Sequence, residues 1–422
     1  MIPYLATFAI SILFCAAGEW ELQKRRKAGF FLCAVSVIFP VVLAAAREYT
    51  VGTDVLTYGN YVFQGALKAQ SPGSFLRSRK DIELLYKALA YAVSRVTNNP
   101  HWFYFATALI ICAFTMWGLL YYRRWCSVTL AWSCFLFLFY GDTLNTMRQC
   151  LALAVVFAAF PFFLEKKYLR FAILSVIAIL FHVTGIIALA LPVIYVFMEV
   201  LPPRWLQFLL IVACVGMILF YSPILRLVLE MKILPAKFSR YMAKGLALAV
   251  KPTILRLPFL IPIVFYYDRF CGFEEVTRAP VVFPTDAAEK CSASQAPVPG
   301  SLQDAEAFWE EREESRKKTK TQVLGMFAVI MLLMEICTVQ LRSVRPALYR
   351  ISFYFGCFRF IAYSRLVKIL RRDNRVIVTA VLFLYLAALW YYQNVVQGNN
   401  QIYPYVYSPG WFERMIPVTP AG

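Results

Sequence analysis

The residues of this chain best suited to chemistry stand in short polar clusters beside long apolar runs. The first cluster spans residues 47–54, Arg47-Glu48-Tyr49-Thr50-Val51-Gly52-Thr53-Asp54. Arg47 and Asp54 could bracket an anionic group and a hydroxyl-bearing group, and Gly52 between them permits a tight turn or a close ligand approach. A basic anchor followed by an ordinary turn explains the same residues equally well, so both interpretations stay open.

A second cluster, Asn145-Thr146-Met147-Arg148-Gln149, opens an apolar run. If a helix already includes these residues, Asn145 and Gln149 share one face and Arg148 lies on the neighbouring stripe. Unpaired N–H groups and the helix dipole at such a start attract anions, and a guanidinium matches phosphate oxygens in pairs. The pattern predicts an anion site, and an arginine that only extends its side chain to a membrane interface is the alternative.

Two further clusters supply a candidate base and more positive charge. His182, in the run Phe181-His182-Val183-Thr184-Gly185, could accept a proton or donate to an oxyanion near neutral pH. A lone histidine in an apolar run is, however, often a simple packing residue. Arg350 opens another apolar run, and Arg240 with Tyr241 adds positive charge to a separate loop.

Several kinds of site are excluded by what the sequence lacks. The chain has 2 histidines and 11 scattered cysteines without a C-x-x-C pair, which argues against a histidine-based metal site and a disulfide framework. The motifs G-x-x-x-x-G-K-[ST], G-x-G-x-x-G and H-E-x-x-H are absent. We therefore expect no metal ion, no cofactor and no nucleic-acid partner.

The elements that must position these clusters follow from the composition. Of 422 residues, 60% are hydrophobic and 16% are charged, with a net charge of +19, whereas soluble proteins carry about a quarter charged residues. A helical crossing needs roughly 20 apolar residues, so we predict an all-α polytopic membrane protein with about 10–12 transmembrane helices. The apolar runs lie at about 2–17, 29–46, 102–121, 128–141, 150–164, 205–221, 253–267, 322–338, 347–364 and 376–392, with 171–200 as two short segments that turn at His182.

The basic residues predict the orientation of these spans. Lysine and arginine mark the cytoplasmic side of short loops, and alternation of the spans then places both termini outside. The polar clusters fall on the same outer side as the loop 47–101. Within that loop, residues 82–96 have the helical periodicity of an amphipathic helix at the membrane surface, and Glu83 lies in it.

Three regions follow from composition. Residues 1–267 form an N-terminal membrane bundle that carries most of the clusters, and residues 322–422 form the C-terminal spans and an outer tail. Between them, residues 268–321 are rich in Pro, Ala, Ser and charge, which predicts a partly flexible cytosolic connector.

Taken in order, the clusters resemble the EpsG family of membrane proteins, relatives of Wzy-type polysaccharide polymerases. The resemblance covers most of the chain. The matching residues are Arg47, Val51-Gly52-Thr53-Asp54, Tyr58, Glu83, Asn145-Thr146-Met147-Arg148-Gln149, Phe181-His182-Val183-Thr184, Arg240-Tyr241, Arg350-Ile351-Ser352-Phe353-Tyr354-Phe355 and Asn400-Gln401-Ile402-Tyr403-Pro404-Tyr405.

The resemblance implies a GT-C-like polymerase of the bacterial cytoplasmic membrane. Such an enzyme joins undecaprenyl-diphosphate-linked oligosaccharide repeat units into an O-antigen, capsule or exopolysaccharide on the outer face. The lipid diphosphate is the leaving group, so no cofactor is needed. Membrane lipids, a flippase and a chain-length regulator are the partners that the resemblance implies.

The same resemblance assigns roles to the clusters. Arg47, Arg148 and Arg350 would bind the diphosphate, and His182, Asp54 or Glu83, in that order of preference, would take the proton from the attacking hydroxyl. Further substrate-binding candidates are Asn145, Gln149, Arg240 and Tyr241. A flippase or exporter of lipid-linked oligosaccharides and a lipid-linked glycan ligase are the alternatives, and only Glu335 and Arg359 are candidates for a polar path deep in the bilayer.

Overall fold

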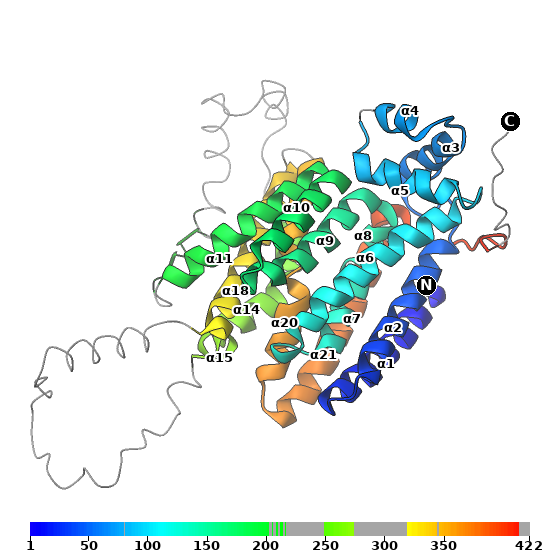
Figure 1. The fold of residues 1–422 in the computed structure, drawn as a ribbon. Helices are drawn as coiled ribbons and strands as arrows, with labels where there is room; N and C mark the ends of the chain where they lie inside the picture. Colours follow the sequence, from blue (N-terminus) through cyan, green and yellow to red (C-terminus); the bar gives the residue numbers. More distant parts are fainter. Residues whose placement is uncertain are drawn as a thin grey trace, which may run out of the picture.

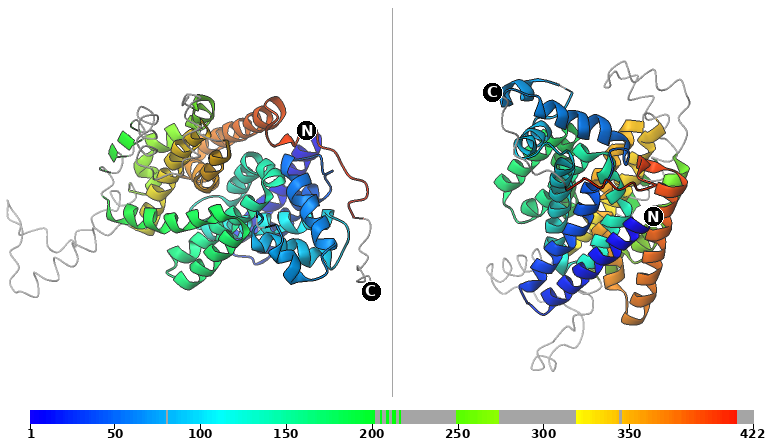
Figure 2. Two further views of the ribbon diagram at one scale, coloured as in Figure 1. Left: turned by 90° about the horizontal axis from the view of Figure 1, so that it is seen from above. Right: turned by 90° about the vertical axis from the view of Figure 1, so that its right-hand side faces the viewer.

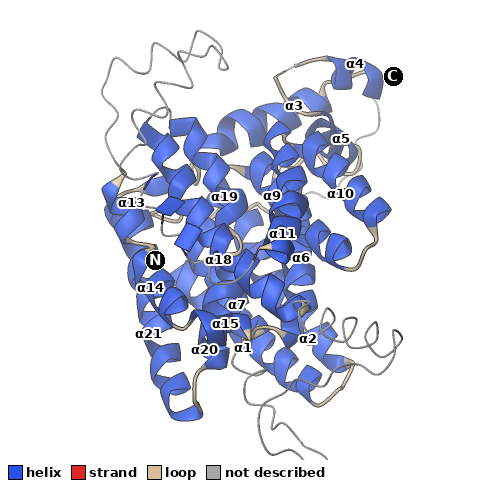
Figure 3. Cartoon of the chain, turned by 90° about the vertical axis from the view of Figure 1, so that its left-hand side faces the viewer, coloured by secondary structure: helices blue, strands red, loops and turns tan. Residues whose placement is uncertain are grey.

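A computed structural model describes residues 1–79, 81–201, 249–273, 319–343 and 346–412, with a few isolated positions between 205 and 216. Over these ranges the chain is helical and contains no β-strand (Figure 3). The only β-type pairing described in them is an isolated bridge between Arg47 and Tyr407. The predicted all-α fold is therefore confirmed.

Seven helical segments of the described chain are long and apolar enough to cross a membrane. Three shorter apolar helices, α5 (Leu84–Ser94), α7 (Val128–Leu138) and α10 (Tyr168–Phe181), accompany them. The chain is thus a multi-pass membrane protein. The seven segments are α1 (Ile2–Gln23), α2 (Ala28–Ala45), α6 (His101–Tyr121) with its extension to Arg124, α9 (Met147–Leu164), Val183–Val200 including α11 (Ala190–Val200), α18 (Lys320–Val339) with its extension to Arg342, and α21 (Arg372–Tyr391) with its extension to Val396.

The helices pack side by side in chain order through much of the bundle. Helix α1 pairs with α2, α2 packs on α6, α6 on α9, and α9 on α10 (Figure 1). Helix α7 joins α1 to α20 (Arg359–Ile369) and to α21. The views in Figure 2 show the last helices alongside the first ones, so the chain closes on itself.

Two helices form the centre of the bundle. Helices α9 and α18 are the most buried of the long segments, whereas α1, α21 and the segment 183–200 are the least buried and expose apolar side chains. Helix α9 carries alanines at 152, 154, 158 and 159, and small residues let neighbouring helices approach closely in lipid. The composition of α9 thus explains its central place.

The bundle has two ends, which we call the site end and the basic end. At the site end the start of α1 meets the C-terminal segment, because the Tyr4 hydroxyl donates to the Ile402 carbonyl at 2.8 Å. There, too, the Ser408 amide donates to the Ala46 carbonyl. The basic end contains the ends of α1 and α6 and the turn between α20 and α21. Both ends of the described chain therefore lie at the site end. That the site end faces the outer side of the membrane stays a prediction.

Residues 47–101 build a small helical cap over the site end. It consists of a π-helical turn (Val55–Asn60), α3 (Tyr61–Leu67), α4 (Pro72–Arg77) and α5. Helix α5 packs on α3, α6 and α10 (Figure 1). The helix predicted at 82–96 is confirmed as α5, and its location at the membrane surface stays a prediction.

Some predicted boundaries need correction. The run 347–364 is not one span, because it divides into a 3-10 turn (Pro346–Ile351), α19 (Ser352–Gly356) and α20. The predicted turn at His182 is confirmed, since α10 ends at Phe181 and a 3-10 helix follows from Val183.

The remaining short helices complete the described chain. They are α8 (Tyr140–Asn145), α13 (Val250–Ile254), α14 (Leu257–Phe265) and α15 (Tyr267–Cys271). Residues 274–318, most of the predicted connector, lie outside the described residues, as does most of the predicted span 205–221. The three predicted regions and the count of 10–12 spans therefore stay predictions.

Candidate functional site

Six of the predicted site residues line one small cavity at the site end: Asp54, Asn145, Arg148, Gln149, His182 and Arg350. Asp54, Arg148, His182 and Arg350 come from the cap, the start of α9, the turn after α10 and the turn before α19. Asn145 and Gln149 come from the end of α8 and the first turn of α9, and Tyr58, Thr146 and Met147 complete the lining. Residues separated by almost 300 positions thus meet because helices α9 and α10 and the segment 346–351 all place an end here.

Arg148 is fixed by a carboxylate and an aromatic ring. Its Nη1 donates to Oε2 of Glu83 at 2.6 Å, and its guanidinium carbon lies 3.9 Å from the centre of the Tyr58 ring. Both side chains of this ion pair are largely but not completely covered. Pairing with a carboxylate and stacking on an aromatic face suit the planar guanidinium better than an ammonium. Arg148 is therefore held in one orientation at the cavity wall.

His182 is oriented by the residue two positions further on. The Thr184 backbone N–H donates to Nδ1 of His182 at 3.2 Å, and the Thr184 hydroxyl lies 2.8 Å from the same nitrogen. A backbone N–H can only donate, so Nδ1 carries the lone pair and the neutral ring keeps its proton on Nε2. That Nε2 lies 3.9 Å from Oε1 of Glu83. His182 is therefore set to donate a hydrogen bond into the site.

Asp54 is the least constrained carboxylate of the cluster. Its Oδ2 lies 3.8 Å from Nη2 of Arg350, and its carboxylate accepts no hydrogen bond from the described residues. Burial raises the pKa of the Asp54 carboxyl above its usual range, although Arg350 and Arg148 act in the opposite direction. The side chain remains 24% exposed, so a ligand can reach it.

Asn145 holds the Asp54 loop in place rather than opening α9. Its Oδ1 accepts from the Thr53 hydroxyl at 2.6 Å and from the Asp54 amide at 2.9 Å. The condition that one helix includes residues 145–149 is not met, because α8 ends at Asn145 and Thr146 leaves helical geometry before α9 begins. Gly52 allows the close approach, since it has φ +102° and a β-carbon there would lie 2.6 Å from the Leu144 carbonyl oxygen.

Gln149 positions the second arginine. Its Nε2 donates to the Arg350 carbonyl at 2.7 Å, which ties α9 to the turn before α19. The Gln149 Oε1 atom is buried and has no hydrogen-bond partner among the described residues. The Arg350 side chain remains 40% exposed, and it lines the cavity. The amide therefore fixes the Arg350 backbone and leaves its charged group available.

A larger polar cavity of about 200 Å³ adjoins this cluster and shares Asn145, Thr146 and Arg350 with it. Asn400 bridges its wall, because its amide donates to Asp142 at 2.9 Å and its oxygen accepts from Asn145 at 3.0 Å. The cavity is rich in guanidinium and amide groups: Arg256, Arg342, Arg350, Arg359, Gln393, Asn394, Asn399 and Asn400 line it. Such a wall can hydrogen-bond to sugar hydroxyls and to anions.

Three buried charged side chains of the described residues form one ion triad, in which Glu335 lies between two arginines. Glu335 accepts from Nε of Arg256 at 2.6 Å and lies 3.0 Å from Nε of Arg359. All three side chains are buried. Gly356 makes the room, because a β-carbon there would lie 2.8 Å from the Glu335 carboxyl carbon. Charges at membrane depth are normally paired in this way.

Arg47 does not join the cluster. Its side chain is 1% exposed, donates to the Ala44 carbonyl at 3.1 Å and lies 5.1 Å from the Tyr104 ring centre. A guanidinium covered on all sides cannot touch a diphosphate in this conformation, so we correct its expected role to a structural one. Arg240 and Tyr241 lie outside the described residues.

Sequence reasoning missed several partners. Tyr354, whose hydroxyl lies 2.9 Å from that of Thr184, supports the histidine turn from α19. Asn400 and Arg256 line the larger cavity, although neither carried an expected role. The only advance signal was that Tyr354 and Asn400 lie in runs that match the family resemblance. The described residues contain no group of three His, Cys, Asp or Glu side chains that could hold a metal ion.

The fold and the cluster together define an all-helical, multi-pass membrane protein with a charged site at one end of the bundle. The chain belongs to the EpsG family, whose model matches residues 30–407. Membership suggests a polysaccharide polymerase-type role, and it associates the protein with lipid-linked oligosaccharides in a membrane. The chain has no significant match among curated proteins or among solved structures.

Proposed function

We propose that this protein polymerises undecaprenyl-diphosphate-linked oligosaccharide repeat units into a surface polysaccharide on the outer side of a bacterial cytoplasmic membrane. One observation carries the proposal beyond the family. An ionisable, unbonded Asp54 carboxylate stands beside the guanidinium of Arg350, in a cavity that also contains Arg148 and continues into an amide-lined space. These groups suit a reaction between a sugar hydroxyl and a sugar diphosphate.

In this reaction a hydroxyl oxygen of one lipid-linked repeat unit attacks the anomeric carbon of the other chain. The new glycosidic C–O bond forms as the bond from that carbon to the diphosphate breaks. The electron pair leaves with the lipid diphosphate, and the hydroxyl proton goes to a protein base. Arg148 and Arg350 stabilise the charge that develops on the diphosphate.

Asp54 is the best placed base of the three candidates. Glu83 is occupied by Arg148 at 2.6 Å, and Nε2 of neutral His182 already carries a proton because Nδ1 accepts from Thr184. The Asp54 carboxylate accepts no hydrogen bond from the described residues, and burial raises its pKa, which makes it a better proton acceptor than an exposed aspartate. His182 then serves as a hydrogen-bond donor to substrate or to Glu83.

Transport is the main competing function, and the deep charges argue against it. A flippase needs a polar path through the bilayer, but the buried Glu335 is already paired with both Arg256 and Arg359. The candidate reaction groups of the described residues gather instead at the site end. A ligase shares the same diphosphate chemistry, and its product distinguishes it.

Deletion of the gene, followed by measurement of surface glycan length, tests the proposal. We expect single repeat units in place of long chains, and restoration of long chains by the wild-type gene. Loss of all surface glycan, with lipid-linked units accumulating inside the cell, would instead identify a flippase. Long lipid-linked chains that fail to reach their final acceptor would identify a ligase.

A further inference from the structure

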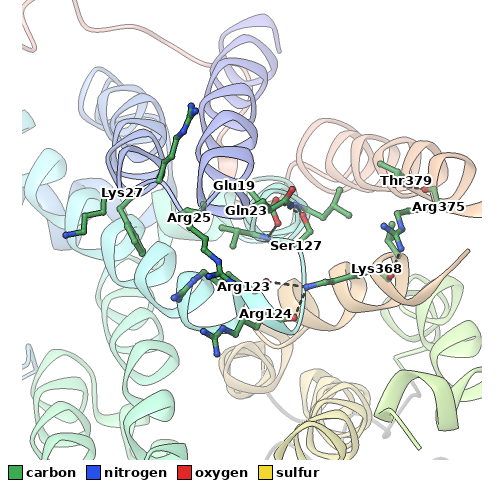
Figure 4. A pocket seen from close by; sticks show the side chains of 16 residues that line it. Glu19, Gln23, Arg25, Lys27, Arg123, Arg124, Ser127, Lys368, Arg375 and Thr379 are labelled. Atoms are coloured by element: carbon green, nitrogen blue, oxygen red, sulfur yellow. Dashed lines mark hydrogen bonds between the residues drawn. The ribbon is translucent and has the colours of Figure 1, made fainter. Parts of the chain in front are cut away.

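A large cavity lies at the basic end, away from the site. It has a volume of about 1040 Å³ and opens between the turn after α1, the turn after α6, and the junction of α20 with α21. Figure 4 shows Arg25, Arg123 and Lys368 reaching toward it from three separate elements. Neither the family resemblance nor the proposed reaction uses these residues.

Positive charge dominates the lining of this cavity. Its basic residues are Arg25, Arg26, Lys27, Arg123, Arg124, Lys368 and Arg375, against the single carboxylate of Glu19. Glu19 is already committed to the start of α7, because it accepts from the Ser127 hydroxyl and from the Val128 and Thr129 amides at 2.7–2.9 Å. Glu19 therefore stabilises the N-terminus of α7, and among the cavity cations only Arg26 has a further carboxylate partner in the described residues, Glu21 at 3.4 Å.

Some of the cations donate hydrogen bonds to backbone carbonyls, whereas others make no such bond with the described residues. Lys368 donates to the Arg123 and Arg124 carbonyls, and Arg375 donates to carbonyls at the end of α20. In contrast, the side chains of Arg25, Lys27 and Arg124 form no hydrogen bond or ion pair with any described residue. Like charges gathered without a partner repel one another, and an anion in the cavity would remove that repulsion.

The cavity also has apolar walls. Leu22, Phe30, Val128, Leu130 and Val367 line it together with the cations. Phe30 is 46% exposed and Phe31 beside it is 70% exposed, as expected for side chains that face lipid. A ligand that fits both parts must carry an anionic head and an apolar body.

We propose that this cavity binds the phosphate headgroup of an anionic phospholipid, with an acyl chain along its apolar wall. The positive-inside tendency explains why basic residues occur at this end, but not why three elements place them around one cavity. Basic pockets between membrane helices bind anionic headgroups by the same physics. A soluble phosphate compound would share the cations but would gain nothing from the exposed phenylalanines.

The test compares two double variants of the full-length protein in neutral detergent. Arg25→Gly/Arg124→Gln removes two unpartnered cations from the cavity. Lys166→Gly/Arg170→Gln removes two cations of the same end that do not line it. The pairs are matched, because Arg25 and Lys166 both occupy left-handed positions, with φ +59° and +60°, just after a helix. Glycine is favourable at such positions, so neither change should impair folding.

Phosphatidylglycerol, phosphatidylcholine and inorganic phosphate are the probes, and bound lipid is measured by native mass spectrometry. We expect wild type to prefer phosphatidylglycerol. The affinity of the cavity variant should fall about fivefold for each cation removed, whereas the matched control should bind like wild type. Equal binding by both variants, or no preference over phosphatidylcholine, would overturn the proposal. Displacement of the lipid by inorganic phosphate would also overturn it, because the site would then belong to a soluble phosphate ligand.

Discussion

Arginines gather at both ends of the bundle, but the two ends differ in how far carboxylates balance the positive charge. At the site end Arg148 pairs with Glu83, and Arg350 lies close to Asp54. At the basic end seven cations share a cavity with Glu19, and that carboxylate is bound to the start of α7. The site end is therefore nearly balanced in charge, whereas the basic end is not.

Under the two proposals, the partners of a basic residue distinguish its role better than its position beside an apolar run does. A balanced arginine is held in one orientation, which a reaction requires. Unbalanced cations instead create a broad positive potential, which attracts anions without fixing their geometry. Substitutions at the two ends should accordingly produce different kinds of effect, and the following predictions run from the largest to the smallest.

Replacement of Asp54 should separate the proposed base from the other carboxylates. If Asp54 accepts the hydroxyl proton, Asp54→Asn should lower the rate of chain growth by about 10²–10⁴-fold. Asp81→Asn is the control, because Asp81 is an exposed carboxylate of the same cap and pairs with Arg79 at 2.9 Å. The growth of polymer length over time in a reconstituted assay gives the rate for both variants. Normal growth in Asp54→Asn would return the assignment to His182 or Glu83.

Replacement of Arg148 should also stop chain growth without preventing folding. Arg148→Ala should cost about 10²–10³-fold in rate, because a charged donor to the developing diphosphate is lost. Arg148→Lys should be impaired as well, since an ammonium cannot both pair with Glu83 and stack on Tyr58 in the same way. Arg77→Ala, an exposed change at the same end, should retain full activity. Activity equal to wild type in Arg148→Ala would contradict the site.

The rate of chain growth should depend on pH through Asp54. A carboxylate accepts a proton only when it is ionised, so the rate should fall as the pH drops through its pKa. Because burial raises the pKa of Asp54, this fall should begin at a higher pH than for an exposed aspartate. A pH–rate profile measures it, and the residual rate of Asp54→Asn should lack this acidic limb. The same limb in the variant would assign the titration to another group.

Breaking the buried triad should affect stability rather than chemistry. Glu335→Gln leaves the guanidiniums of Arg256 and Arg359 buried without a counter-charge, which should cost about 3–5 kcal/mol. At the basic end, Glu21→Gln breaks only the exposed pair with Arg26, and exposed pairs contribute about 0–1 kcal/mol. Thermal unfolding in detergent compares the two variants. Equal shifts would mean that the triad is not a closed unit.

The smallest effect should come from the cap of α7. Ser127 accepts from the Leu130 amide and donates to Glu19, so Ser127→Ala should cost about 1 kcal/mol. The same change at Ser71, which caps the six-residue helix α4, should alter the unfolding temperature less, because exposed short helices open locally before the bundle unfolds. A larger shift at Ser71 would reverse this ranking.

The sequence predicted the fold class well because hydrophobic runs report membrane burial directly. It also named Asp54, Arg148, His182 and Arg350, which the structure brings to one cavity. Polar residues beside apolar runs are rare enough to be noticed without knowing what they contact.

Tertiary packing explains what the sequence could not reveal. Arg47 and Arg148 both stand next to long apolar runs, but only packing against Tyr104 and Ala44 buries the first. Asn145, next to the break at Thr146, contacts the Asp54 loop about 90 positions earlier in the chain, and no local pattern encodes such a contact. The ion pair between Arg148 and Glu83 joins residues 65 positions apart, so it forms only when the chain has folded.

The contact of Asn400 with Asp142 and Asn145 affects the order in which the cavity wall is assembled during synthesis. Residues 398–408 follow every span described here, and they also cover the start of α1 and the end of α2. During synthesis, the helices that carry Arg148 and His182 enter the membrane long before this segment exists. The wall of the larger cavity is therefore completed only after the last helix has been inserted, so a partly synthesised chain lacks a finished site.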